Sequence, residues 1–314
     1  MVEFQIVSDL HLESPKAYDS FEISPRAPYL ALLGDIGCTK HRNGYLGFLR
    51  RHLHLFKIVF LVLGNHEPWY SSWDDSREQM REFEETIRHE RNTDATLGEF
   101  VFLDKSAYTF SPASDGKVTV LGCTLFSRVP EHALKAVSFG IKNFYHISGW
   151  TVEEHDENFQ QELSWLNDQV RNRQDKDDRL VIFTHHSPSL DDRAMDPKHK
   201  NSLILSGFAS DLSSEVCWTS PNVKLWAFGH NHFNCDFIDE VHQIRVFTNQ
   251  RGYAISQSHG FDAEKIVIIK QCESKIVLSL FEDSDVTFPV ESWLHRTLFS
   301  HERRERQQST SISR

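Results

Sequence analysis

At 314 residues, of which 39% are apolar, the chain is long enough to bury a substantial core in one large domain or two small ones. Its formal net charge of -11 argues against a protein that holds a nucleic acid polymer by neutralising many backbone phosphates. The chain starts without a signal-peptide pattern, and its longest apolar stretch, Ile58–Leu63, is far too short to span a bilayer. Five cysteines form no C-x-x-C pair, so we expect a globular, cytoplasmic protein with reduced thiols and no membrane segment.

Five apolar, β-rich runs are each followed closely by a polar motif. In chain order the runs are Phe4–Val7, Tyr29–Leu33, Ile58–Leu63, Leu180–Phe183 and Leu225–Phe228. The motifs are Asp9-Leu10-His11, Gly34-Asp35, Gly64-Asn65-His66-Glu67, His185-His186 and Gly229-His230-Asn231-His232. Because the loops after parallel strands gather at one edge of an α/β sheet, the pattern predicts five strands whose ends share one site.

Helical spacing of apolar residues recurs in two segments between these strands. Met80, Phe83 and Ile87 predict a helix from about residue 74 to 91. A second series that includes Phe159 and Leu166 predicts a helix from about residue 152 to 171. We interpret both apolar faces as core contacts.

Several shorter apolar runs predict further strands. Phe100–Leu103, Tyr108–Phe110 and Val118–Leu121 are expected to form antiparallel hairpins around a turn at residues 111–116. More strands are expected over residues 225–247 and 265–280, without a long helix among them. Two packed sheets in one domain, residues 1–295, are therefore predicted, followed by a polar, disordered tail at residues 296–314.

A long stretch after His186, reaching to about Val223, lacks a clear pattern. Long loops inside a compact domain are often functional, so the stretch is a candidate lid over the site. The alternative is a surface excursion with a short helix near Phe208–Val216.

The five motifs offer carboxylate, amide and imidazole ligands but no cysteine. This donor set suits manganese, our first choice, with iron, zinc or magnesium as alternatives. Two cations held close together need a bridging anion, and Asp35 is the natural candidate because it is the carboxylate of a Gly-Asp turn at a strand end.

The ordered set of motifs resembles the calcineurin-like metallophosphoesterase superfamily, and Asn249, Arg251 and Tyr253 resemble an ending seen in some uncharacterised bacterial and fungal members. The resemblance implies a four-layer α/β/β/α sandwich of two mixed sheets, with a dinuclear metal site at the carboxyl ends of strands. It further implies the residues that hold the metals. The first metal would be held by Asp9, His11 and His232, the second by Asn65, His185 and His230, and both by Asp35.

Two neighbouring histidines compete for one ligand position. Strand alternation sends adjacent side chains to opposite faces, so only one of His185 and His186 can easily point inward, and we favour His185. Asn65, Arg128 and His186 are candidate substrate-binding residues; for Arg128 a surface salt bridge is the competing interpretation. Asn143 and His146 lie in an aromatic-rich stretch that either walls the pocket or packs in the core.

The expected reaction follows from charge. Two divalent ions with Asp9 and Asp35 stay cationic enough to bind a phosphate oxyanion and to acidify a bridging water, whose hydroxide attacks phosphorus in line. His66, implied by the resemblance to stay unligated, is expected to protonate the departing oxygen. Asp35 and His66 are thus the predicted catalytic residues.

Departures from one branch of the superfamily narrow the substrate. Protein phosphatases carry two phosphate-gripping arginines, whereas this chain has Ile36–Lys40 after the Gly-Asp turn and Leu63 before Gly64. A hydrolase that acts on the phosphodiester or phosphomonoester bonds of small molecules or nucleotides is therefore our interpretation. The alternatives are a nuclease and a non-catalytic scaffold for protein binding. No oligomeric state is predicted.

Overall fold

The computed structural model describes residues 1–112, 116–173 and 178–270. Its strands form two large mixed sheets and a small two-stranded ribbon of β11 (Gly252–Tyr253) and β12 (Ser256–Gln257). The five-stranded sheet has the order β13-β1-β2-β3-β4 and the six-stranded sheet the order β5-β6-β7-β8-β10-β9. The predicted tail at residues 296–314, the domain end at residue 295 and most of the strand run over 265–280 lie outside the described residues.

All strands that precede the five motifs lie in these two sheets. The first sheet consists of β1 (Val2–Val7), β2 (Tyr29–Leu33), β3 (Ile58–Val62), β4 (Glu99–Phe102) and β13 (Ile266–Ile269). The second consists of β5 (Ser106–Phe110), β6 (Val118–Cys123), β7 (Arg179–Thr184), β8 (Val223–Phe228), β9 (Asp236–Ile238) and β10 (Arg245–Thr248). In the first sheet β1, β2, β3 and β4 pair in parallel with their neighbours, and in the second sheet β6, β7, β8 and β10 do so. The loops that follow these strands therefore lie at the carboxyl-terminal edge of each sheet.

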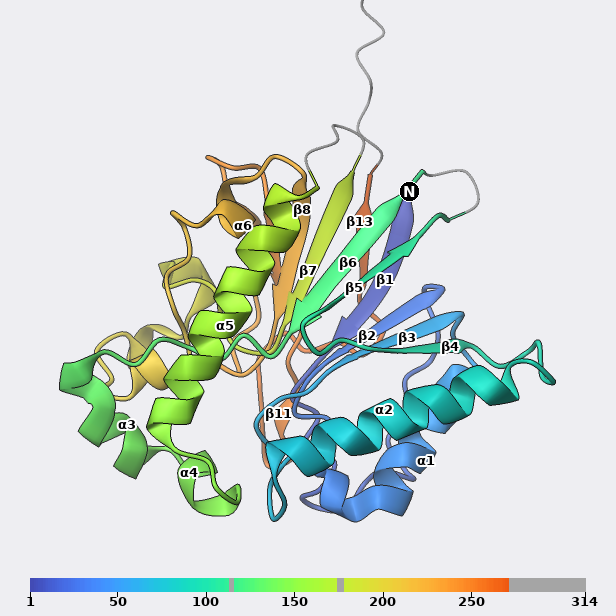
Figure 1. Ribbon diagram of the computed structural model, residues 1–314, viewed down its shortest axis with the longest axis horizontal. Helices are drawn as coiled ribbons and strands as arrows, with labels where there is room; N and C mark the ends of the chain where they lie inside the picture. Colours follow the sequence, from blue (N-terminus) through green and yellow to red (C-terminus); the bar gives the residue numbers. More distant parts are fainter. Residues whose placement is uncertain (113–115, 174–177, 271–314) are drawn as a thin grey trace, which may run out of the picture. The chain divides into compact units, whose positions relative to one another are not determined.

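Strand alternation explains why the two sheets stack. Phe4, Phe60 and Phe183 point from β1, β3 and β7 into one core between the sheets, with ring centroids 5.5 to 6.2 Å apart. The intervening residues, such as Leu61 and Ile182, point outward into a second core beneath the helices. Helices α1 (Arg42–Leu53) and α2 (Trp73–Glu90) cover the first sheet, and α5 (Val152–Arg171) covers the second (Figure 1). The architecture is the expected four-layer α/β/β/α sandwich.

The two predicted helices are present with local signals that fix their starts. Ser72 caps α2 (Trp73–Glu90), and Thr151 with Glu154 forms a capping box at the start of α5 (Val152–Arg171). Shorter helices that were not predicted complete the fold: α1 (Arg42–Leu53), α3 (Leu134–Gly140), α4 (Asn143–His146) and α6 (Val216–Thr219).

Two expectations about connecting segments are wrong. The run Phe100–Leu103 is not part of an antiparallel hairpin, because β4 pairs in parallel with β3 at the edge of the first sheet; only β5 and β6 form the hairpin. No helix covers Phe208–Val216 either. Residues 186–223 instead contain 3₁₀ helices at Asp192–Ala194, Pro197–His199 and Leu205–Gly207, besides α6.

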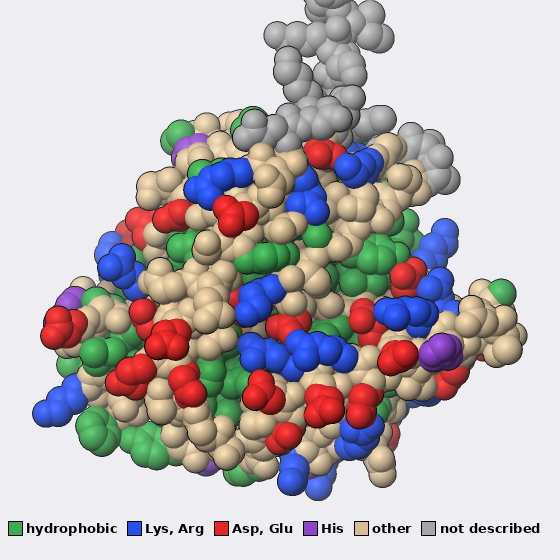
Figure 2. Space-filling model, viewed as in Figure 1, with side chains coloured by type: hydrophobic (Ala, Val, Ile, Leu, Met, Phe, Trp, Pro, Cys, Tyr) green, Lys and Arg blue, Asp and Glu red, His purple; other side chains and the backbone are tan. Residues whose placement is uncertain are grey.

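The surface over α2 and α5 mixes charges of both signs (Figure 2). Arg77 and Arg81 of α2, for example, both contact the carboxylate of Asp104. The negative charge on this face is therefore interspersed with bases, as on an ordinary solvated surface. Within the described residues, every helix is too short or too polar to cross a membrane.

Candidate metal centre

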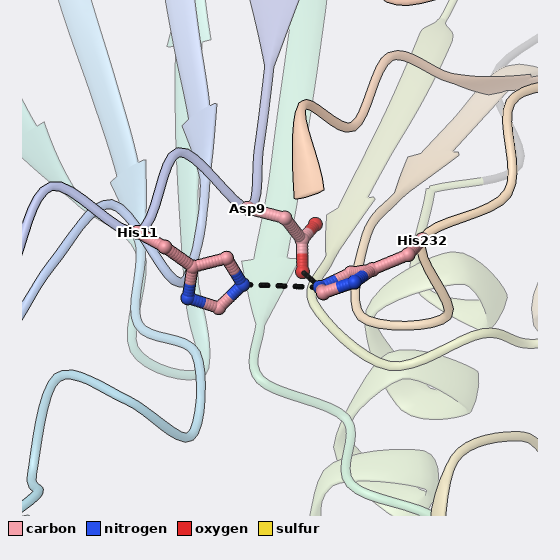
Figure 3. Close-up of side chains that lie close together, drawn as sticks. All are labelled: Asp9, His11 and His232. Atoms are coloured by element: carbon pink, nitrogen blue, oxygen red, sulfur yellow. Dashed lines mark hydrogen bonds and ion pairs between the residues drawn. The ribbon is translucent and has the colours of Figure 1, made fainter. Parts of the chain in front are cut away.

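The five polar motifs meet at the carboxyl ends of their strands. Asp9 and His11 follow β1, and His232 follows β8; their side chains converge on one point (Figure 3). The Nε2 atoms of His11 and His232 lie 3.0 Å apart, and Nε2 of His232 lies 3.3 Å from Oδ1 of Asp9. These donor atoms all lie within 4.8 Å of one another, close enough to bind one cation.

A second cluster lies beside the first. Asp35 after β2, His185 after β7 and His230 after β8 place one donor atom each within 4.8 Å of the others. Oδ1 of Asp35 lies 3.4 Å from Nε2 of His185, while its Oδ2 lies 3.9 Å from Nε2 of His11. The two oxygens of Asp35 therefore face different clusters, as a bridging carboxylate requires.

The hydrogen bonds of His185 indicate that a cation belongs in the second cluster. Its Nδ1 donates to the carbonyl oxygen of Leu33 at 2.8 Å, so in the neutral ring Nε2 carries a lone pair and no proton. That lone pair faces Oδ1 of Asn65 at 3.0 Å and the carboxylate of Asp35. Three acceptors facing one another repel unless a cation lies between them, and Nε2 of His230 is likewise buried without a hydrogen-bond partner.

A chain of side-chain amides sets the orientation of Asn65. Nε1 of Trp69, which can only donate, lies 3.2 Å from Oδ1 of Asn143, which identifies that atom as an acceptor. The same oxygen accepts from Nδ2 of Asn65 at 3.0 Å. The carbonyl oxygen of Asn65 is therefore the atom that faces His185 and the second cluster.

Glu13, which sequence reasoning missed, lies beside both His11 and His66. Its Oε1 accepts from Nδ1 of His66 at 2.8 Å and lies 3.4 Å from Nδ1 of His11. A proton on Nδ1 leaves the Nε2 lone pair of His11 free to face the first cluster. The only sequence signal was a carboxylate two residues after His11.

The backbone at the motifs is held in a conformation that residues with side chains rarely adopt. Positive φ values between 48° and 74° occur at Asp9, His11, Asp35, His230 and His232. Such left-handed non-glycine residues cost free energy and concentrate at functional sites. Five of the seven predicted ligands share this feature.

Glycine is required where two of the turns touch. A Cβ atom on Gly64 would lie 2.5 Å from the backbone nitrogen of Asp35 and 2.7 Å from Cε1 of His185. Any side chain at residue 64 would therefore push two predicted ligands apart.

Glu67 lies beneath the centre and ties these turns together. Its carboxylate accepts backbone N–H groups of Asp35, Ile36 and Gly64 at 2.8 to 2.9 Å and the hydroxyl of Tyr45 at 3.1 Å. Burial raises the pKa of Glu67 to about 7 despite these hydrogen bonds. The residue therefore supports the turns that carry the proposed ligands.

The two buried aspartates differ in electrostatic environment. Burial opposes the charge on Asp9, but the hydrogen bond and charge of His232 outweigh it and lower the pKa. Burial, together with the carboxylates of Glu67 and Asp9, raises the pKa of Asp35 well above its usual value. A cation next to Asp35 would favour its ionised form, so the donor set fits divalent ions.

His66 lies at the edge of the centre rather than in either of these two clusters. Its Nε2 is 3.9 Å from Oδ2 of Asp35, and its ring stacks on Trp69 with centroids 3.7 Å apart. Burial lowers the pKa of His66 to about 4, although Glu13 opposes this shift. The ring is thus held by stacking on one side and by a carboxylate at Nδ1, which leaves Nε2 facing the centre.

The predicted substrate residues are scattered. Asn65 and His66 line a cavity of about 350 Å³ that opens beside the centre, together with Asn143. Among the described residues, Arg128, His146 and His186 do not line it. Arg128 is exposed, and its backbone N–H donates to Ser210.

His186 lies behind the centre. Its ring is buried and packs against His230, with centroids 4.0 Å apart, and against Phe126 and His155. The placement favours His185 as the inward-facing residue of the pair, as strand alternation predicts.

Comparisons with known proteins agree on the fold. A family model described as calcineurin-like phosphoesterase matches residues 4–234. The chain is similar to the phosphopantetheinyl hydrolase of Mycobacterium tuberculosis, with 16% identity, a TM-score of 0.56 and coverage of 80% of this chain and 90% of the other. No curated protein matches it at a significant level.

Two other solved structures have lower TM-scores. A dimetal phosphatase from Danio rerio has 18% identity, a TM-score of 0.44 and coverage of 83% and 90%. The anchor protein of the inner membrane complex of Plasmodium has 12% identity, a TM-score of 0.45 and coverage of 86% and 78%.

Proposed function

Because the chain belongs to the calcineurin-like phosphoesterase family and is therefore a hydrolase of phosphoric esters, we propose that it cleaves phosphodiester or phosphomonoester bonds of small molecules or nucleotides at a centre of two divalent ions. The observation that carries the proposal is the pair of donor clusters on either side of Asp35. Asp9, His11 and His232 would hold one ion, and Asn65, His185 and His230 the other. Asp35 would contribute one oxygen to each.

The ions would supply the charge that acidifies a bridging water as the nucleophile and stabilises the phosphoryl oxygens during an in-line displacement. The chain's own residues set the geometry of this reaction. Asp35 separates the two clusters, and Asn143 keeps the carbonyl oxygen of Asn65 directed inward. Glu67 holds the turns of Asp35 and Gly64 in register.

His66 is the proposed general acid. Its pKa of about 4 means that the free protein carries the neutral ring at pH 7. An anionic phosphoryl group beside Nε2 raises that pKa, and the Glu13 carboxylate at Nδ1 stabilises the resulting imidazolium. His66 then donates its Nε2 proton to the departing oxygen.

Manganese is the first choice among the metals because imidazole and carboxylate donors are mixed and no cysteine belongs to the donor set; iron, zinc and magnesium are alternatives. The volume of the cavity, about 350 Å³, suits a small phosphorylated substrate. A cytoplasmic location remains a prediction from the sequence.

The test uses the full chain, stripped of metal and reloaded separately with Mn²⁺, Fe²⁺, Zn²⁺ or Mg²⁺. Each form is assayed with 4-nitrophenyl phosphate and bis(4-nitrophenyl) phosphate, which share a leaving group, and metal content is measured by elemental analysis. We expect two ions per chain and hydrolysis of at least one ester. Two bound ions without hydrolysis of any ester would contradict the catalytic proposal and favour a binding scaffold.

A further inference from the structure

The residues that line the cavity beside the metal centre fall into two groups. One group belongs to the centre and includes Asp35, Asn65, His66 and His230. The other is mainly apolar, with Ile141, Met195, Ile204, Leu205 and Phe208, and also includes the polar side chains of Asp196, His199 and Ser202. A molecule whose phosphoryl group lies at the centre would therefore have apolar side chains beside the rest of its structure.

Two segments far apart in sequence build this apolar wall by packing against each other. Gly140 and Ile141 end helix α3, and Ile204 and Gly207 belong to the stretch after β7. A Cβ atom on Gly140 would lie only 2.6 Å from Cγ2 of Ile204, so the segments are in close contact. Both join one small core with Val137, which is fully buried. The wall is a packed structure and not a loose flap.

Backbone pairing fixes the wall to the metal centre. Ser187, two residues after His185, accepts from the N–H of Ser210 at 3.0 Å and donates to the carbonyl of Phe208 at 3.2 Å. The ring of Phe208 stacks on His230 with centroids 4.7 Å apart and an angle of 21° between planes. The apolar surface thus begins directly beside a proposed ligand.

Positive charge is sparse along this wall. Apart from the histidines of the centre, the basic side chains among the described lining residues are Lys142 and His199, and both are exposed at the rim. No arginine is found among those lining residues. If the leaving group carried further phosphates, their charges would lie against apolar side chains without a paired cation. Their desolvation would then cost free energy that nothing offsets.

We propose that this wall binds the leaving group of the substrate and that this group is apolar, an alkyl or aryl group rather than a nucleoside or a polyphosphate. The inference rests on the proposed phosphoesterase function and names the substrate class of the same site. Under this proposal Ile204 and Leu205 determine substrate specificity, because both line the cavity and neither is a proposed metal ligand.

The first test measures kcat/KM of the metal-loaded full chain for phosphate esters of methanol, butanol and cyclohexylmethanol. The esters are monoesters or diesters, according to which of the two the protein hydrolyses. Esters with uridine or uridine diphosphate as the leaving group are the polar comparison. Each buried methylene contributes roughly fourfold, so the butyl ester, with three more methylenes, is expected to exceed the methyl ester by about 60-fold. Equal rates across the alkyl series, or a preference for the uridine esters, would overturn the inference while leaving phosphoesterase activity established.

Variants separate the wall from general damage to the fold. Ile204→Asn and Leu205→Asn are each expected to cut the butyl-to-methyl preference to less than about tenfold. Leu203→Asn is the matched control, because Leu203 is 81% exposed and does not line the cavity. Equal loss of preference in Leu203→Asn would overturn the assignment.

A binding measurement that needs no turnover completes the test. Fluorescence anisotropy of 2-naphthol, an aryl alcohol, reports its binding to the metal-free chain. Binding is expected in the native chain and in Leu203→Asn and should be at least about fivefold weaker in Ile204→Asn. Absent or unaltered binding would overturn the proposed wall. If no ester is hydrolysed but 2-naphthol binds as expected, the proposed function fails and the apolar site stands.

Discussion

The turns that carry the proposed ligands and the stretch that walls the cavity are built in different ways. Each turn directly follows a buried strand, and the turns of Asp35 and Gly64 are joined through the buried carboxylate of Glu67. Residues 187–222, which supply one side of the wall, contain three short 3₁₀ helices and one four-residue helix among turns and irregular segments, and Leu203 there is 81% exposed. The sheets thus fix the chemistry, while a less regular segment shapes the space for the substrate.

The largest effect is expected from removing the charge of the carboxylate that both clusters share. Asp35→Asn removes the charge between the two clusters, so at least one ion should be lost and kcat should fall about 10³-fold or more. Elemental analysis and the ester assay check both effects. Full metal content in the variant would show that Asp35 is not the bridge.

Replacing His66 should separate metal binding from turnover. His66→Asn removes the proposed acid but no proposed ligand, so kcat for an ester with a poor leaving group should fall about 10² to 10⁴-fold with both ions retained. An ester of 4-nitrophenol should be less affected, because its leaving group needs little protonation. Near-native turnover of a poor leaving group would contradict this role.

Glu13→Gln tests whether the carboxylate acts through His66. The expected effect is a fall in kcat of about 10 to 100-fold with unchanged metal content, because the orientation of a catalytic side chain is weakened. The double variant Glu13→Gln/His66→Asn should be no slower than His66→Asn alone. Glu22→Gln, at an exposed position, is the control, and additive losses would contradict the coupling.

Asn143 connects the two regions, since it lines the cavity and also holds Asn65. Asn143→Leu should weaken binding of the second ion by about tenfold, measured by metal titration, because Asn65 loses the partner that directs its carbonyl oxygen inward. Asn143→Asp keeps an acceptor for both donors and should retain affinity. If Asn143→Asp is as weak as Asn143→Leu, the proposed amide chain does not set the orientation.

A further prediction concerns the stability of the fold around His155 on helix α5. Burial lowers the pKa of His155 from 6.5 to about 4, and its ring accepts from Ser127. The neutral ring therefore stabilises the fold fully above about pH 6.5, and this contribution, up to about 3 kcal/mol, is lost as pH falls toward 4.

Denaturant unfolding at pH 7, 5.5 and 4.5 checks this sign. His155→Gln keeps an acceptor and cannot titrate, so its unfolding free energy should fall less with decreasing pH than that of the native chain. His89→Gln, at an exposed position on α2, should follow the native chain. Parallel curves for the native chain and His155→Gln would rule out the contribution.

Many of the helices and strands were predictable because their sequence signals are local. The polar residues after each apolar run indicated where the strands end, and the spacing of Phe159 and Leu166 predicted α5. The pairing partners of the strands were harder to predict. No local sequence signal indicates that β4 pairs with β3 in the first sheet instead of forming a hairpin. The role of Glu13 and the contact of Asn143 with Asn65 depend on packing between elements distant in the chain.

The sequence by itself determined the order of the motifs, the family and hence the class of reaction. The reason is that the residue types, and therefore their donor atoms, and their positions after apolar runs can be read directly from the sequence. Only the tertiary structure decided which ring nitrogen of His185 faces the centre and that Arg128 lies away from the cavity. The apolar wall was decided there too, since α3 and residues 204–208 meet only after folding. The physical reason is that donor chemistry belongs to single residues, whereas orientation and cavity shape arise from contacts across the fold.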